Sequence, residues 1–208
     1  MIDPATLPLA QKASLAGGAA FFTTHQVGDV PTVVLMDGPH GLRKPADRDD
    51  HMGLGPSVPA TCFPPAVGLG QSWDGDLVAR VAAALAAECR HHGVDVLLGP
   101  GVNVKRSPLA GRSFEYFSED PVLSAALATS WVASLQAHGV GASLKHFAAN
   151  DQETDRMRVS ADVDPRPLRE IHLRAFQRVV EEARPWTVMC SYNRLNGVPA
   201  SQNAFLLT

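Results

Sequence analysis

Four short apolar runs place the strongest constraint on how this chain can fold. They cover residues 32–36, 94–98, 140–144 and 187–190, and each ends abruptly at a polar residue or a glycine. Short runs that are β-branched or leucine-rich, and apolar on both faces, are typical of strands buried inside a parallel sheet. The sequence therefore predicts four buried strands.

Helical segments separate these runs. Asp74 and Asp120 carry the short carboxylate that caps a helix N-terminus, and proline at 121 suits the first helical turn. Glycine is favoured just beyond the end of a helix, where Gly93 and Gly139 stand. We expect one helix between Asp74 and Gly93 and a second between Asp120 and Gly139.

A third helix is predicted between Asp164 and Pro185. Asp164-Pro165 repeats the capping pattern, and the later proline closes the segment. Its apolar residues are three or four positions apart, as one helical face requires: Leu168, Ile171, Ala175 and Val179.

The alternation of strands and helices favours an α/β fold with parallel strands joined by crossovers. An eight-stranded TIM-type (β/α)8 barrel typically needs about 250 residues, so four strands would supply its first half. We therefore expect residues 1–208 to be the N-terminal portion of a barrel domain, incomplete by itself. The proline- and glycine-containing stretch 44–65 predicts a long loop after the first strand, where barrel enzymes keep their sites.

Composition excludes several classes of protein. A chain of 208 residues with 45% hydrophobic and 19% charged residues is ordinary for a globular domain, which argues against disorder. The net charge of −3 gives no electrostatic reason to expect nucleic acid or an anionic membrane as partner. No run approaches the ~18 apolar residues of a membrane span. A small neutral substrate fits better, and oligomeric state is left open.

The cysteines indicate neither a disulfide framework nor a zinc site. Cys62, Cys89 and Cys190 are odd in number and far apart in the chain. The first residues also lack the basic segment and apolar stretch of a secretory signal. We expect free thiols, no cofactor, no metal and a cytoplasmic protein.

Polar residues of interest follow the predicted strands. They are Asp37, Arg112 in the loop after the second strand, Lys145-His146, and Tyr192. The carboxyl ends of parallel barrel strands meet at one face, so these side chains should converge there. A lysine at a strand end is the most unusual of them, because buried lysine is rare without a partner.

Four segments make this pattern specific: MDGPHGLR at 36–43, GPGVNVKRSPLAGRSFEYFSEDP at 99–121, SLKHFAANDQETDR at 143–156 and TVMCSYNRLNGVPAS at 187–201. In sequence, order and spacing they resemble the signature of glycoside hydrolase family 3, of the β-glucosidase type. The resemblance covers essentially the whole chain. It implies hydrolysis of terminal non-reducing β-D-glucosyl residues by a retaining mechanism, with a small carbohydrate as substrate.

The resemblance also implies a set of sugar-binding residues, with Met189 and Tyr192 bordering the pocket: Asp37, Arg112, Lys145, His146, Arg156, Met189 and Tyr192. We expect Lys145 to lie beside Asp37, where opposite charges keep both groups ionised. Arg106, Glu115, Glu119 and Asp120 belong to the same signature. We interpret them as loop scaffolding and helix capping, with the GR-x-F-E stretch forming a salt-bridged turn that aims Arg112.

The two catalytic carboxyl groups are expected beyond Thr208. Retaining glycosidases need a nucleophile and an acid about 5 to 5.5 Å apart. The family nucleophile is an aspartate in an S-D-W-like motif, and no such motif occurs in the 208 residues. Asp37 matches a substrate ligand instead, so no catalytic residue is assigned within the chain.

Other functions stay open. A β-N-acetylhexosaminidase is disfavoured, because its relatives carry KHFPGHG where this chain reads KHFAANDQETDR. β-Xylosidase or another β-glycosidase activity remains an alternative, as does a catalytically inactive sugar-binding fragment. Dinucleotide binding at Gly99-Pro100-Gly101 lacks the full GxGxxG spacing. Metal binding by His91-His92 is weaker still, because adjacent helical residues do not face one direction.

Overall fold

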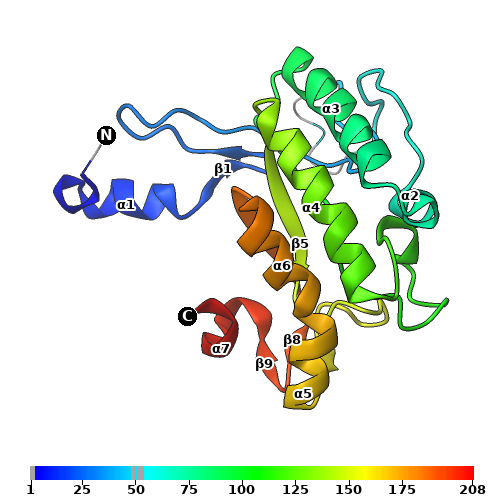
Figure 1. The fold of residues 1–208 in the computed structure, drawn as a ribbon. Helices are drawn as coiled ribbons and strands as arrows, with labels where there is room; N and C mark the ends of the chain where they lie inside the picture. The colour runs from blue at the N-terminus through cyan, green and yellow to red at the C-terminus, as the bar shows by residue number, and fades with distance from the viewer. Residues whose placement is uncertain (1–2, 48–49, 51–53) are drawn as a thin grey trace.

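The computed structural model describes residues 3–47, 50 and 54–208, and its centre is a four-stranded parallel sheet (Figure 1). The strands are β3 (Leu35–Met36), β4 (Val96–Leu97), β5 (Gly141–Phe147) and β7 (Thr187–Cys190), in that order across the sheet. Three helices connect them and lie side by side along the sheet: α3 (Gly75–His91), α4 (Pro121–Ala137) and α6 (Arg174–Ala183). The predicted α/β fold with four parallel strands is confirmed.

The strand limits differ from the prediction in an informative way. β3 and β4 are shorter than their apolar runs, whereas β5 continues past Leu144 to Phe147. Lys145 pairs in register with Met189 of β7, and its carbonyl accepts a 2.8 Å hydrogen bond from Val102 N. Lys145 and His146 therefore lie within the strand rather than after it, because neighbours on both sides extend the ladder.

The first two predicted helices are confirmed together with their caps. The Asp74 carboxylate accepts a 2.9 Å hydrogen bond from Leu77 N, and the Asp120 carboxylate accepts one of 2.8 Å from Val122 N. Gly93 and Gly139 follow the two helices with φ of 65° and 82°, a conformation that favours glycine.

The third helix is not continuous. A short α5 (Pro165–Pro167) leads into a π-helical turn at Leu168–His172, in which Leu173 N donates to Leu168 O at 2.9 Å, before α6 begins. The extra residue in this turn rotates the helix face. Ile171, expected in the apolar stripe, is 40% exposed, while His172 is 3% exposed and takes the buried position. The predicted stripe was wrong at Ile171.

The core fills the space between the helices and the sheet. Its largest fully buried side chains include Leu85 of α3, Leu97 of β4, Trp131 of α4 and Leu144 of β5. Burying side chains of this size stabilises a fold by roughly 1.5–3 kcal/mol each relative to exposing them.

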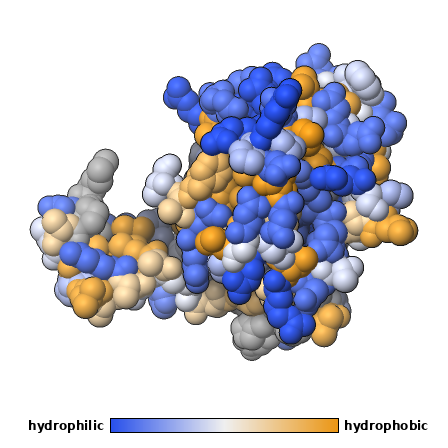
Figure 2. Space-filling view, turned by 90° about the horizontal axis from the view of Figure 1, so that it is seen from below, coloured by the Kyte–Doolittle hydropathy of each residue, from blue (hydrophilic) through white to orange (hydrophobic). Residues whose placement is uncertain are grey.

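The N-terminal segment projects from this body (Figures 1 and 2). It comprises α1 (Leu9–Leu15) and a hairpin of β1 (Gly18–Ala20) and β2 (Thr23–Thr24). Leu35 N donates to Phe22 O at 2.9 Å, and Thr24 N donates to Val33 O at 3.1 Å. The hairpin thus covers the outer edge of β3.

The remaining elements, apart from the 3-10 turn Pro4–Thr6 in the projecting N-terminal segment, lie toward the carboxyl ends of the sheet strands. They are α2 (Ala66–Ser72), a small sheet of β6 (Ser160–Ala161), β8 (Arg194–Leu195) and β9 (Val198–Pro199), α7 (Ala204–Leu207), and 3-10 turns at Pro4–Thr6, Ser113–Glu115 and Ala200–Gln202. The predicted loop between β3 and α2 holds no helix or strand in its described residues. Within the same limits, no helix combines the length and apolarity needed to cross a bilayer.

Candidate functional site

Asp37 stands at the carboxyl end of β3, at the start of a tight loop. Its carbonyl accepts a 3.0 Å hydrogen bond from Arg43 N. The loop packs closely on the next strand end, because a Cβ added to Gly99 would lie 2.7 Å from the Cβ of Pro39. The Asp37 carboxylate is half-buried and has no hydrogen-bond partner among the described residues. It is therefore available to a ligand.

Glu115 joins the two site cations. It lies in the 3-10 turn Ser113–Glu115, is 4% exposed, and pairs with Arg112 Nε through one oxygen. Its other oxygen lies 3.4 Å from Lys145 Nζ, which is equally buried. A buried carboxylate is costly unless it is paired, and here two cations compensate it.

This pairing corrects one prediction and confirms another. Lys145 was expected beside Asp37, but within the described chain its ion pair is with Glu115. The turn that carries Arg112 brings Glu115 into reach of both cations, so Asp37 is not needed to neutralise the lysine. The expected salt-bridged turn that fixes Arg112 is confirmed. Burial disfavours the charged guanidinium, but the charge and hydrogen bond of Glu115, together with Tyr116 and Glu153, raise the pKa of Arg112.

His146 is held on both its backbone and its ring. Its N–H donates to Asn103 Oδ1 at 2.8 Å, and its carbonyl accepts from Asn103 Nδ2 at 2.9 Å. Tyr116 Oη lies 3.1 Å from the ring Nδ1. Burial, reinforced by the nearby cations, lowers the pKa of His146 to about 2, so the imidazole is neutral near pH 7.

The phenol fixes which ring nitrogen carries the proton. Burial raises the pKa of Tyr116, so its hydroxyl keeps its proton. That hydroxyl accepts from Asn150 Nδ2 at 3.3 Å and can donate to His146 Nδ1 at 3.1 Å, which is nearer than its other acceptor, Asn150 O, at 3.4 Å. A donated proton at Nδ1 leaves the imidazole proton on Nε2.

The last three predicted residues lie on the β7 side. Met189 is the register partner of Lys145, so both side chains stand on the same face of the sheet. The Arg156 guanidinium lies 5.3 Å from the centre of the Tyr192 ring and forms a 3.0 Å ion pair with Glu153. The positive charge of Arg156 also contributes, after burial, Arg112 and Lys145, to the lowered pKa of His146.

Several contributing residues were missed in the sequence. The His40 ring lies 5.8 Å from the Phe114 ring, and its pKa is lowered mainly by burial, with opposing effects of Glu115 and Lys145. Through this ring contact, His40 connects the Asp37 loop to the 3-10 turn that carries Glu115. Asn103 and Tyr116 orient His146. All three residues lie within the motifs at 36–43 and 99–121, and this was the one feature of the sequence that could have indicated their part in the site.

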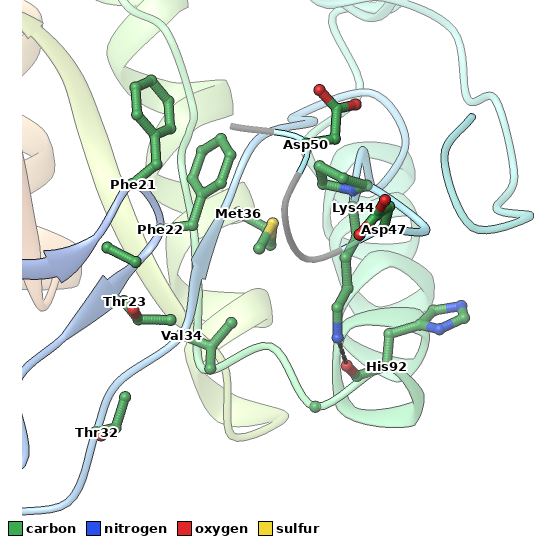
Figure 3. A pocket seen from close by; sticks show the side chains of 13 residues that line it. Phe21, Phe22, Thr23, Thr32, Val34, Met36, Lys44, Asp47, Asp50 and His92 are labelled. Atoms are coloured by element: carbon green, nitrogen blue, oxygen red, sulfur yellow. Dashed lines mark hydrogen bonds between the residues drawn. The ribbon is translucent and has the colours of Figure 1, made fainter. Parts of the chain in front are cut away.

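Two cavities lie outside the set of predicted sugar-binding residues, although Asn150, which bonds to Tyr116, lines the second. One of about 550 Å³ is formed by the N-terminal hairpin, β3 and the loop after it, where Lys44 Nζ donates to His92 O (Figure 3). Another of about 280 Å³ lies between the segments that follow β5 and β7. Neither is lined by a predicted sugar-binding residue, so we do not place the sugar in them. Among the described residues, no group of three His, Cys, Asp or Glu side chains is arranged to hold a metal ion.

Known proteins are similar to this chain in sequence and in fold. The model of the glycosyl hydrolase family 3 N-terminal domain matches residues 23–208. Thermostable beta-glucosidase B of Acetivibrio thermocellus is 54% identical over 204 residues, which cover 97% of this chain and 27% of that protein. An exo-alpha-(1->6)-L-arabinopyranosidase of Bifidobacterium longum is 54% identical over 205 residues, with the same coverage of both chains.

A solved structure agrees. Beta-glucosidase 3B of Thermotoga neapolitana, in complex with alpha-D-glucose, superposes with a TM-score of 0.91 at 43% identity, covering 99% of this chain and 31% of that one. The likeness confirms the predicted barrel-type α/β fold. The chain spans about 27% of the length of the relatives described above.

Proposed function

Because the chain belongs to glycoside hydrolase family 3 and matches its N-terminal domain, we propose that it supplies the sugar-binding part of a retaining β-glucosidase. The activity proposed for the complete enzyme is hydrolysis of terminal non-reducing β-D-glucosyl residues. The observation that carries the proposal is the half-buried, unpartnered Asp37 carboxylate at the carboxyl end of β3, in the same parallel sheet whose strand β5 carries Lys145 and the neutral His146 imidazole.

Each group has a distinct part in binding a sugar. Asp37 accepts hydrogen bonds from two neighbouring hydroxyls, which makes it the main acceptor of the site. Arg112 and Lys145 donate to hydroxyl oxygens, and Glu115 holds both in place. His146 donates from Nε2. A sugar hydroxyl both donates and accepts hydrogen bonds, so it suits a site that offers acceptors as well as donors.

The apolar faces of the sugar need a different partner. Met189 and the ring of Tyr192 cover C–H surface, while the Tyr192 hydroxyl stays free to bond. Arg156 over the Tyr192 ring limits how that ring can move.

No residue of the chain is proposed as nucleophile or acid. Glu115 is engaged by two cations, and Asp37 serves as a sugar ligand. A retaining mechanism needs two carboxyl groups about 5 to 5.5 Å apart. Both are proposed to come from the part of the family's enzymes that this chain does not match.

A pentopyranosidase is the second candidate. One relative is named an arabinopyranosidase and is as similar to this chain as the β-glucosidase is. Pentopyranosides such as xylosides and arabinopyranosides keep the ring hydroxyls but lack the hydroxymethyl group. The proposed ligands address ring hydroxyls, so they serve either class.

A segment exchange tests the proposal. Residues 1–208 replace the matching segment of the Acetivibrio thermocellus β-glucosidase, which supplies the nucleophile and acid, and the product is assayed on aryl β-glucoside, β-xyloside and α-L-arabinopyranoside. We expect the β-glucoside to have the highest kcat/KM. A folded but inactive exchange protein would contradict the glucosidase proposal, and a preference for either pentoside would favour the second candidate.

A further inference from the structure

His172 is a buried histidine outside the proposed sugar site. It faces Asp151, which ends the segment 148–151. His172 Nδ1 lies 2.8 Å from Asp151 Oδ2, close enough for an ion pair although without the alignment of a hydrogen bond. The His172 side chain is 1% exposed and that of Asp151 is 14% exposed. Within the described chain, His172 Nε2 and Asp151 Oδ1 have no hydrogen-bond partner.

The π-helical turn is what points His172 inward. The added residue of the turn places His172 in the buried position and leaves the neighbouring Ile171 at 40% exposure. Burying isoleucine would stabilise the fold more than burying an incompletely satisfied polar pair. Turns of this kind are frequent at functional sites. We propose that His172, through Asp151, is a positioning residue that keeps the His146 ring in one orientation and one tautomer.

Asp151 ends a short chain of contacts that leads to His146. Its neighbour Asn150 donates from Nδ2 to Tyr116 Oη at 3.3 Å. Tyr116 Oη is in turn 3.1 Å from His146 Nδ1. The position of Asn150 therefore decides whether the phenol can donate to that nitrogen.

The segment 148–151 needs to be held at both ends. Ala149 has φ of 55°, a left-handed conformation that residues with a Cβ rarely adopt and that costs free energy. At one end, Ala148 O accepts hydrogen bonds from Ser191 Oγ at 3.1 Å and Asn193 Nδ2 at 3.2 Å. At the other end, Asp151 has His172. Without that contact Ala149 can relax, and Asn150 then leaves Tyr116.

The proposal rests on the proposed role of His146 as a sugar ligand that donates from Nε2. A ring that exchanges between tautomers would present an acceptor in place of that donor for part of the time. The tautomer of His146 can be measured in the absence of sugar and of turnover. A result that contradicts the role of His172 can therefore be told apart from one that contradicts the proposed function.

The test is the tautomer of His146 in the 208-residue chain, labelled with nitrogen-15 in its histidines. Two-bond proton–nitrogen correlation spectra at pH 7 distinguish protonated Nε2 from protonated Nδ1. We expect a single Nε2–H pattern in the wild type, its loss in His172→Ala, and its recovery in His172→Gln, which can again donate to Asp151. Ile171→Ala, a change in the same turn on its exposed side, should leave the pattern unchanged.

Asp151→Asn keeps the shape of the side chain and removes its charge, so it decides the matter if His172→Ala does not fold. Loss of the single pattern in this variant supports the proposal. A wild-type pattern in folded His172→Ala, or in folded Asp151→Asn, would overturn it. A wild-type tautomer together with an inactive segment-exchange enzyme would overturn the proposed function and leave this inference standing.

Discussion

Lys145 Nζ lies 3.4 Å from Glu115 Oε2, and both side chains are only 4% exposed. The lysine is thus neutralised by a residue of the supporting turn. The carboxylate of Asp37 is left without a protein partner among the described residues. Its oxygens can therefore accept the hydrogen bonds from sugar hydroxyls that the proposed function assigns to them.

Replacing Glu115 by glutamine removes the charge that compensates the buried Lys145 and the partly exposed Arg112. Removing one partner of a buried ion pair typically costs about 3–5 kcal/mol, so we expect a loss of unfolding free energy of about that size. Urea unfolding of the variant and the wild type measures it. Glu119→Gln, an exposed change in the same segment, should stay within about 0.5 kcal/mol. Equal stabilities of the two variants would contradict the buried-pair account.

Asp37→Ala addresses the sugar rather than the fold. In the segment-exchange enzyme we expect kcat/KM on an aryl β-glucoside to fall at least ~100-fold, or roughly 3 kcal/mol, because charge-assisted hydrogen bonds to the sugar are lost in the transition state. Unfolding free energy should change little, since the Asp37 carboxylate has no partner in the described chain. Asp76→Ala on the surface of α3 is the control. Activity within a factor of two of wild type would remove Asp37 from the site.

The helix caps offer a matched comparison. Asp120 accepts a hydrogen bond from Val122 N, whereas the side chain of Asp164 makes no cap hydrogen bond to its helix. We therefore expect Asp120→Ala to lower the unfolding free energy by about 1 kcal/mol and Asp164→Ala to lower it by less than about 0.5 kcal/mol. Thermal or urea unfolding of both variants would reveal the difference. Equal losses would show that the cap bond at Asp120 does not account for its effect.

The pH dependence of stability should report His146. Burial, with Arg112, Lys145 and Arg156, lowers its pKa from 6.5 to about 2. Between these values the unfolded chain binds a proton there that the folded chain does not, so stability decreases as pH falls below 6.5. The slope contributed is up to about 1.4 kcal/mol per pH unit. Unfolding measured from pH 6 to pH 4 should show a smaller slope in His146→Gln, and an unchanged slope would contradict the assigned pKa.

The sequence predicts this fold well where the signal is local. The Asp74 and Asp120 caps and the apolar run at 187–190 depend on a few neighbouring residues, and the helices and strand they predict are present. The length of β5 could not be predicted in this way. Its last residues are polar or aromatic, and they belong to the strand because β7 and the segment after β4 bond to them.

Two features of the site depend on tertiary contacts. A regular helix of 3.6 residues per turn predicts Ile171 on the buried face, and only the π-helical turn exchanges it for His172. The partner of Lys145 was predicted to be Asp37, which directly follows an apolar run, whereas Glu115 stands in another motif and does not follow such a run. The three-dimensional path of the turn at 113–115 decides it.

In the four-stranded sheet each strand lies beside the strand that precedes it in the chain. The hairpin occupies the outer edge of β3, while β7 has β5 as its one sheet neighbour in the described chain. Because strand order across the sheet equals strand order along the chain, each strand is added at the edge formed by the strand before it. No strand of this sheet has to insert between two strands that are already paired, so the sheet can form in the order in which the chain is synthesised.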